Sequence, residues 1–275
     1  ATGVLGGIAG LVGLSAVAGL LVTATVTPAI AVSGAAASSA ITMFDNMPSY
    51  LEIDDLMQQS EIYAKQSDGS DLLLARFYDQ NRLPVTYEQI APVMFDAILS
   101  SEDPRYYEHG GVDLIGTTRA LLSNAQGGQT QGGSSISQQY VKNVLVQKCE
   151  KEAPTQEELA ACWEKVTLAK GIEGYQRKLQ EMRYAIALEQ RYSKSDVLLG
   201  YLNIANFGGT TYGIGAAAQY YFSVNASDLT LSQAANIAET VQNPNTHRID
   251  NPAPERKGAA YRFAKPTDRR NYHLG

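Results

Sequence analysis

The first 44 residues of the chain contain no charged side chain, and the first charge in the sequence belongs to Asp45. Within this stretch, Gly3–Val26 is an apolar run broken only by three hydroxyl side chains. A helix that crosses a bilayer needs roughly 20 apolar residues, because no water is available there to satisfy backbone groups. We therefore expect residues 1–44 to form one transmembrane helix with its flank.

A cleaved signal peptide is the alternative for the same stretch. Ala35-Ala36-Ala37 follows the run and supplies the small residues typical of a cleavage site. The apolar run is longer than a usual signal core of roughly 7–15 residues, which favours an anchor that is retained. The rest of the chain is then expected to work at a membrane surface.

Residues 45–275 carry all the formal charges, 22 basic and 28 acidic, which give a net charge of −6. A chain of this length can bury a sizeable core, and its composition is that of a water-exposed globular domain. The acidic balance argues against a nucleic-acid partner held on a broad basic face. We expect no nucleic-acid partner.

The sequence pattern predicts a mainly α domain with one small β element. Residues 45–60 alternate apolar and acidic positions, and we expect a short amphipathic helix there. Asp68-Gly69 lies between two strand-like runs and predicts a β-hairpin over 61–78. The resulting units are 45–85, a connecting helix and hairpin; 86–252, the main domain; and 253–275, the start of a linker to a further C-terminal region.

Helical spacing of apolar residues dominates from Tyr87 onward. Helices are expected over 87–100, 114–122, 135–146, from 155, over 172–186, 195–203 and 232–241. In the long helix, one apolar stripe is expected to face the core. The stripe consists of Ile172, Tyr175, Leu179, Met182 and Ile186.

Cys149 and Cys162 are the only cysteines, and neither their spacing nor their neighbours suggest a metal site. In an extracytoplasmic domain we expect an oxidised pair that staples a loop and adds about 3 kcal/mol of stability. Two unpaired thiols would instead indicate a domain that faces the cytosol.

The first stretch with chemical potential is Glu102-Asp103, which follows an apolar helix and precedes Pro104. A carboxylate at such a boundary can be partly desolvated, which raises its pKa and suits it to general base catalysis. The alternative is a solvated acidic pair beside Arg105. His109 is expected to form structural hydrogen bonds, because the three histidines lack metal-binding spacing.

The second stretch begins at Gly132-Gly133 and opens a helix rich in hydroxyls and amides. Free backbone N–H groups at a helix start favour an anion such as phosphate, and Lys142 adds a cation about two turns along. The Gly-Lys-Ser/Thr ending of a Walker loop is absent. A serine-rich helix cap is the alternative, and it leaves Gln138-Gln139 unexplained.

The third stretch is Arg177-Lys178 with Glu181, whose side chains project to one side of a helix. The alternative is a surface ion pair worth only a few tenths of a kcal/mol. The order of cation before anion is the less favourable one for such a pair.

Taken together and in this order, these stretches resemble the family-51 peptidoglycan glycosyltransferases, the polymerase domain of class A penicillin-binding proteins. Five ordered motifs match between about residues 60 and 252. The matching residues are Glu102, Asp103, Tyr106, His109 and Gly111; Gly132–Gln139; Arg177, Lys178 and Glu181; Tyr201, Leu202, Asn203, Phe207 and Gly208; and Leu231–Pro252. Tyr106 replaces a family Phe, and Ser135 and Ser137 replace family Thr while keeping the hydroxyl.

Some features depart from the family pattern. Gly200 stands where the family usually has an acidic residue, and Glu239-Thr240 replaces a small pair. The insertion that holds Cys149 and Cys162 is not a general family feature. The insertion and the hydroxyl replacements resemble actinobacterial members.

The resemblance implies a lysozyme-like head lobe with a smaller membrane-proximal jaw lobe. It implies an inverting transfer that polymerises lipid II into β-1,4-linked glycan and releases undecaprenyl pyrophosphate. Glu102 is the implied general base, and Glu181 positions cations. The implied substrate-binding residues are Asp103, Arg119, Ser134, Ser135, Gln138, Gln139, Lys142, Arg177, Lys178 and Asn203.

The resemblance also implies a bacterial cell-membrane location, with the catalytic domain outside the cytoplasm. Its partners are then lipid II, the nascent glycan, membrane lipid and other cell-wall synthesis and division proteins, and inhibitors of the moenomycin type are expected to act on it. No cofactor is required, although Glu181 is a candidate ligand for a divalent cation, Mg or Mn, at the pyrophosphate.

Two other functions fit parts of the pattern. In a lysozyme-like hydrolase, Glu102 would act as a general acid. The Arg177-Lys178 pair argues against this function, because hydrolysis of a neutral bond needs no pyrophosphate site. In a membrane-anchored interaction module the site would be degenerate, and the intact set of carboxylates and cations argues against that.

Overall fold

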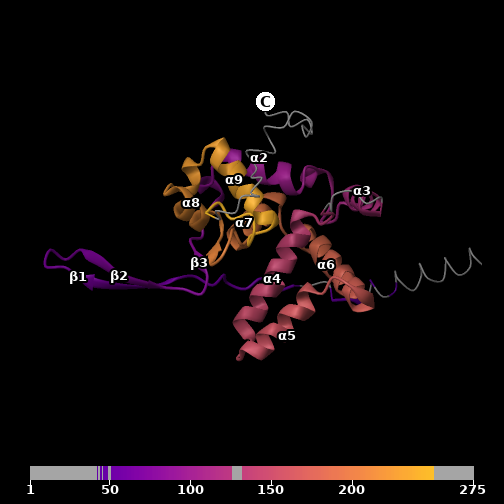
Figure 1. Ribbon diagram of the computed structural model, residues 1–275, viewed down its shortest axis with the longest axis horizontal. Helices are drawn as coiled ribbons and strands as arrows, with labels where there is room; N and C mark the ends of the chain where they lie inside the picture. The colour runs from indigo at the N-terminus through magenta and orange to yellow at the C-terminus, as the bar shows by residue number, and fades with distance from the viewer. Residues whose placement is uncertain (1–41, 43, 45, 49–50, 126–131, 251–275) are drawn as a thin grey trace, which may run out of the picture. The chain divides into compact units, whose positions relative to one another are not determined.

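The computed structural model describes residues 42, 44, 46–48, 51–125 and 132–250 (Figure 1). The chain divides into two compact units, Ala1–Met47 and Pro48–Gly275. The predicted transmembrane helix and the 253–275 linker lie outside the described residues. Among the residues that are described, no helix is long and apolar enough to cross a membrane. The fold below is that of the second unit.

The predicted hairpin is confirmed. Strands β1 (Ser60–Lys65) and β2 (Asp71–Phe77) pair in an antiparallel register that sets Lys65 against Asp71. Between them Gly69 adopts a φ of +84°, a conformation that glycine enters without a steric penalty. The Ser70 N–H donates to the Asp68 carboxylate over 2.9 Å and closes the turn.

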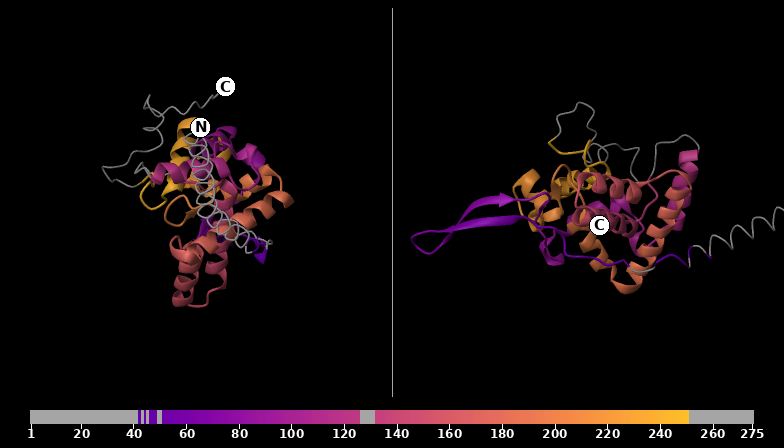
Figure 2. Two further views of the ribbon diagram at one scale, coloured as in Figure 1. Left: turned by 90° about the vertical axis from the view of Figure 1, so that its right-hand side faces the viewer. Right: turned by 90° about the horizontal axis from the view of Figure 1, so that it is seen from below.

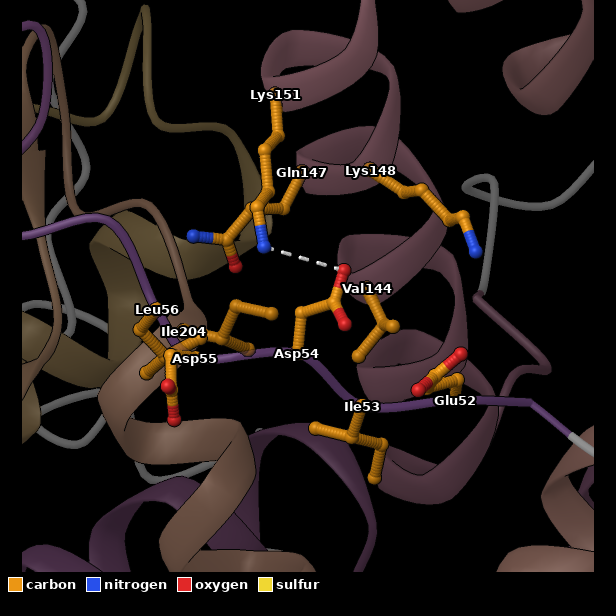
Figure 3. A pocket seen from close by; sticks show the side chains of 10 residues that line it. All are labelled: Glu52, Ile53, Asp54, Asp55, Leu56, Val144, Gln147, Lys148, Lys151 and Ile204. Atoms are coloured by element: carbon orange, nitrogen blue, oxygen red, sulfur yellow. Dashed lines mark ion pairs between the residues drawn. The ribbon is translucent and has the colours of Figure 1, made fainter.

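The helix expected over 45–60 is wrong for its second half, because residues 51–59 form neither a helix nor a strand. Three apolar side chains of this segment, Leu51, Ile53 and Leu56, pack against the core. The segment runs alongside helix α4, where Asp54 pairs with Lys151 at 3.4 Å (Figure 3). The two together line a shallow pocket.

The described residues from 87 onward are mainly helical, as predicted. Eight α-helices follow: α2 (Pro92–Glu102), α3 (Leu114–Ala125), α4 (Ile136–Glu152), α5 (Gln156–Thr167), α6 (Gly171–Arg191), α7 (Lys194–Ile204), α8 (Ile214–Phe222) and α9 (Leu231–Gln242). Short 3-10 turns lie at Tyr87–Gln89, Tyr106–Glu108 and Ala226–Asp228. Strands β3 (Asn81–Arg82) and β4 (Thr211–Tyr212) form a short parallel pair.

The core forms where α2 packs on α9 and where α4 packs on α6 and α7. Gly200 of α7 explains one departure from the family pattern. A Cβ there would lie 2.5 Å from the Tyr140 hydroxyl of α4, closer than non-bonded atoms approach. Glycine therefore allows the two helices to pack together, and an acidic side chain at this position would collide with Tyr140.

Helix α6 buries a different face from the predicted stripe. Ile172 is 78% exposed and Tyr175 is 76% exposed. The buried residues are Gly174, Glu181, Ala185 and Leu188. The first turns of α6 thus leave apolar side chains outside the core, and a carboxylate, Glu181, lies inside it.

The structure joins Cys149 of α4 and Cys162 of α5 in a disulfide, with a Cα–Cα distance of 5.7 Å, as expected for an oxidised pair. Thr155 caps α5 by accepting the Glu158 N–H, as the spacing of these two residues predicts. No residue of α5 is buried. In Figures 1 and 2 helix α5 lies at the outer end of α4, and the disulfide links these two helices.

Candidate active site

Glu102 ends helix α2, and a side chain of α4 holds its carboxylate. Gln139 Nε2 donates to Glu102 Oε2 over 3.1 Å, and Ser101 Oγ donates to Oε1 over 3.2 Å. Gln139 in turn accepts a hydrogen bond from Tyr201 Oη of α7 over 3.0 Å. The Glu102 side chain is half-buried, so it combines a fixed position with access from outside.

Asp103 points inward instead of toward a substrate. It is 3% exposed, and its Oδ2 accepts the Ile136 N–H over 3.0 Å. Its Oδ1 lies 2.9 Å from His109 Nε2, so His109 has the structural role expected of it. The carboxylate is engaged on both oxygens and fastens the end of α2 to the start of α4.

Two backbone N–H groups at the start of α4, where a phosphate site was predicted, already bind acceptors within the protein. The Ile136 N–H already binds the Asp103 carboxylate, and the Gln138 N–H already binds Ser135 Oγ. An anion from the chain itself thus occupies the favourable end of the helix dipole.

Ser135 and Gln138 form the helix cap that was the alternative reading of this stretch. The Ser135 N–H donates to Gln138 Oε1 over 3.1 Å, while both side chains are buried. Ser135 Oγ also donates to the Gly111 carbonyl over 2.5 Å. Gly111 has a φ of +82°, and a Cβ there would lie 2.6 Å from the Ala185 carbonyl oxygen, so only glycine fits.

The basic stretch of α6 forms a cluster around a buried carboxylate. Arg177 Nη1 lies 2.6 Å from Glu181 Oε2, and Lys178 Nζ contacts Glu181 Oε1. The Glu181 side chain is 3% exposed, whereas those of Arg177 and Lys178 are 18% and 33% exposed. This is not the surface ion pair of the alternative reading, because the acid is buried and the two cations reach toward the surface.

Two further contacts fix the orientation of this cluster. Lys178 Nζ donates to Ser134 Oγ over 2.6 Å, which ties α6 to the segment that precedes α4. Arg177 Nε donates to the Leu168 carbonyl over 2.6 Å, at the end of α5. Ser134 therefore lies beside the cations.

Lys142 and Arg119 are exposed cations outside the cluster. Lys142 lies on α4, one turn beyond Gln139, and within the described part of the chain its ammonium has no partner. Arg119 lies on α3, whose Thr117 Oγ1 donates to the Gly133 carbonyl over 2.8 Å. Both side chains are open to a ligand.

Asn203 does not reach this region. Its Oδ1 accepts the Val85 N–H over 3.0 Å, and its Nδ2 donates to the Val85 carbonyl over 2.9 Å. It lies two residues after Tyr201, and side chains two apart on a helix point about 200° apart. Asn203 thus ties α7 to the Val85 backbone instead of lining the site.

The side chains around Glu181 do not fit a protein-held metal ion. Both Glu181 oxygens already accept from cations. Within the described ranges, no group of three or more His, Cys, Asp or Glu side chains is arranged to hold one. A divalent cation that arrives with a substrate pyrophosphate remains a prediction.

Several supporting residues were missed by sequence reasoning. Lys194 Nζ contacts Glu189 at 2.6 Å, the His109 carbonyl at 2.7 Å and the face of the Tyr106 ring. Glu189 also accepts from the buried Ser137 hydroxyl. No local sequence pattern predicts these contacts. Tyr201 belongs to the Tyr201-Leu202-Asn203 motif, but the sequence did not indicate a role for its hydroxyl.

The start of α4 brings the two chemical parts together. Ser134, beside the cation cluster, and Gln139, on the carboxylate, are five residues apart in the chain. The arrangement can therefore take a proton at Glu102 while placed cations receive negative charge nearby.

The chain is similar to known proteins over most of its length. Residues 70–266 match the family model described as Transglycosylase. The chain is 33% identical over 230 residues to a penicillin-binding protein 1A of Vibrio cholerae, which covers 83% of this chain and 24% of the relative. It is 34% identical to penicillin-binding protein 1A of Mycobacterium tuberculosis and of Escherichia coli, over 72% and 73% of this chain and 21% of each relative.

The chain therefore spans about a quarter or less of the length of the curated relatives that it matches. The matched region contains the hairpin's second strand and every element that contributes to the site.

Proposed function

The chain belongs to the transglycosylase family, the peptidoglycan glycosyltransferases of class A penicillin-binding proteins, and we propose that it polymerises lipid II. The product is a β-1,4-linked glycan strand, and undecaprenyl pyrophosphate is released. The single observation that carries the proposal is that the start of α4 contacts the Glu102 carboxylate through Gln139, while the preceding Ser134 contacts Lys178 of the cation cluster.

In the proposed reaction, Glu102 acts as the general base. The 4-hydroxyl of the acceptor sugar loses its proton to the Glu102 carboxylate as the oxygen attacks the anomeric carbon of the donor. The Gln139 amide holds this carboxylate in place. Attack on the side opposite the pyrophosphate inverts an α-linked donor to a β-linked product.

The leaving pyrophosphate carries charge that must be balanced as its bond to the sugar breaks. Lys178 and Arg177 supply cations held in a fixed geometry by Glu181 and the Ser134 hydroxyl. Lys142 and Arg119 are exposed and can move onto the phosphates when the substrate binds. Glu181 therefore orients cations instead of exchanging protons.

A membrane location follows from the lipid tail of this substrate. The predicted anchor supports it, and so do the exposed apolar side chains of two helices of the described fold. These are Leu114, Ile115, Ile172 and Tyr175, which lie on α3 and α6. We propose that they belong to the jaw lobe that faces the bilayer outside the cytoplasm. Other cell-wall synthesis and division proteins are the proposed protein partners.

Glu102→Gln tests the proposal with fluorescently labelled lipid II. We expect the variant to fold normally and to form no polymer, whereas Glu108→Gln, at an exposed acid of the same stretch, keeps its activity. Substantial polymer from Glu102→Gln would remove Glu102 as the base. A parallel incubation with purified sacculi tests hydrolysis, since released fragments would support the lysozyme-like alternative. A well-folded wild-type protein that turns over no lipid II would support the interaction module.

A further inference from the structure

A chain of hydrogen bonds runs from the core of α7 to the candidate base. Tyr201 Oη donates to Gln139 Oε1 over 3.0 Å, and Gln139 Nε2 donates to Glu102 Oε2 over 3.1 Å. Helices α7, α4 and α2 contribute one residue each. The outer member of this chain, Tyr201, has no exposed surface and cannot touch a substrate.

The middle residue is an amide, which has an acceptor at one end and donors at the other. Its useful orientation directs the NH₂ group at Glu102, because the reverse orientation sets the amide oxygen against the carboxylate. The Tyr201 hydroxyl satisfies the amide oxygen in this orientation. Without that hydroxyl, Gln139 Oε1 loses its donor, and the amide is free to rotate toward other groups.

The Tyr201 hydroxyl remains a donor throughout the working pH range. Burial, followed by the negative charges of Glu102 and Asp103, raises the pKa of Tyr201 well above its ordinary value. The phenol therefore stays protonated and continues to donate to Gln139.

We propose that Tyr201 is a positioning residue that acts on Glu102 through Gln139 and holds the base in its carboxylate form. The inference rests on the proposed role of Glu102 and adds a residue that does not contact the substrate. A hydrogen bond donated to a carboxylate favours its charged state, so loss of the Tyr201 hydroxyl shifts Glu102 toward protonation.

Other charged groups lie on the elements around Glu102. Asp96 lies on α2, Asp103 follows Glu102 on the chain, Lys142 lies one turn beyond Gln139 on α4, and Glu239 lies on α9, which packs along α2. Tyr201→Phe leaves all four in place. A change in the pH profile of this variant therefore reports the loss of one hydroxyl.

The test is the pH dependence of kcat and kcat/KM for lipid II polymerisation by Tyr201→Phe. The acidic limb is expected to move upward by about one pH unit, which corresponds to about a tenfold lower rate on that limb. At high pH the rate should approach that of the wild type, because Glu102 is then ionised in both proteins. A loss of equal size at every pH, or an unchanged profile, would overturn the proposal.

Tyr140→Phe is the matched control. Tyr140 is a buried tyrosine next to Gln139, and its hydroxyl has no hydrogen bond within the described part of the chain. The acidic limb of the pH–rate profile of Tyr140→Phe should coincide with that of the wild type. An equal shift in Tyr140→Phe would assign the effect to packing between α4 and α7 and would overturn the role of Tyr201.

Gln139→Leu keeps the proposal testable if Tyr201→Phe fails to fold. It removes the donor itself, so the same upward shift of the acidic limb is expected, and an unshifted limb would overturn the inference. Where both variants fold, the double variant should shift no further than Gln139→Leu alone. Glu102→Gln distinguishes failure of the proposed function from failure of this inference. Polymerisation by Glu102→Gln would contradict the proposed function. An inactive Glu102→Gln together with an unshifted acidic limb in Tyr201→Phe would contradict only the role of Tyr201.

Discussion

The Asp103 carboxylate accepts the backbone N–H of Ile136 over 3.0 Å, so the acidic pair at the end of α2 is fastened to the start of α4. This contact divides the two acids between two tasks. Asp103 completes the helix start and is 3% exposed, whereas Glu102 remains half-buried beside Gln139. Asp103 thus fixes the end of the helix that carries Glu102, the candidate base.

Asp103→Asn should lower the free energy of unfolding by about 1–3 kcal/mol, because hydrogen bonds to charged groups and the helix dipole both favour the carboxylate. Urea denaturation at pH 7 measures this change. Asp79→Asn replaces an exposed acid and should alter stability by less than about 0.5 kcal/mol. Equal stability of the two variants would show that the hydrogen bonds of the Asp103 carboxylate do not contribute to the free energy of unfolding.

Glu181→Gln should reduce lipid II turnover on the order of 100-fold, since it leaves Arg177 and Lys178 without the charge that orients them. Initial rates with labelled lipid II measure the loss. Glu173→Gln provides the control, because Glu173 is an exposed acid in the first turn of the same helix. Near-normal turnover by Glu181→Gln would move the residue to a purely structural role.

Lys142→Ala should lower kcat/KM for lipid II about tenfold without changing the melting temperature, since a charge-assisted contact to a phosphate is lost and no described partner is disturbed. Lys148→Ala is the comparison on the same helix, where the lysine pairs only with Glu152 at 3.7 Å. If Lys142→Ala retained the full rate, pyrophosphate binding would have to rely on the other cations.

Much of the fold could be predicted because the signals are local. The Asp68-Gly69 turn, the Thr155 cap and the helical spacing after Tyr87 each depend on neighbours in sequence, and the structure confirms them. Segment 51–59, which forms neither a helix nor a strand, was misassigned because its mixture of apolar and acidic positions was interpreted as an amphipathic helix. The conformation of this segment depends on its contact with α4, which local sequence propensity does not indicate.

The site was harder to predict, since a motif names residues without saying which way they point. Asp103, Ser135, Gln138 and Asn203 were expected to bind substrate, yet each is buried and bonded within the protein. Ser134 and Gln139 have the same side chains as Ser135 and Gln138, yet they remain partly accessible, as does Lys178. Only the packing of α2, α4, α6 and α7 separates these two groups.

Replacing both Cys149 and Cys162 with alanine should lower stability by about 3 kcal/mol, because the bridge closes a short loop in the unfolded chain. It should also raise KM for lipid II several-fold. No residue of α5 is buried, and the Leu168 carbonyl that ends α5 orients Arg177 over 2.6 Å, so a loosened α5 lets this cation move. Reductant should lower the melting temperature of the wild type and leave the alanine variant unchanged. A lower melting temperature with an unchanged KM would show that Leu168 keeps its place without the disulfide.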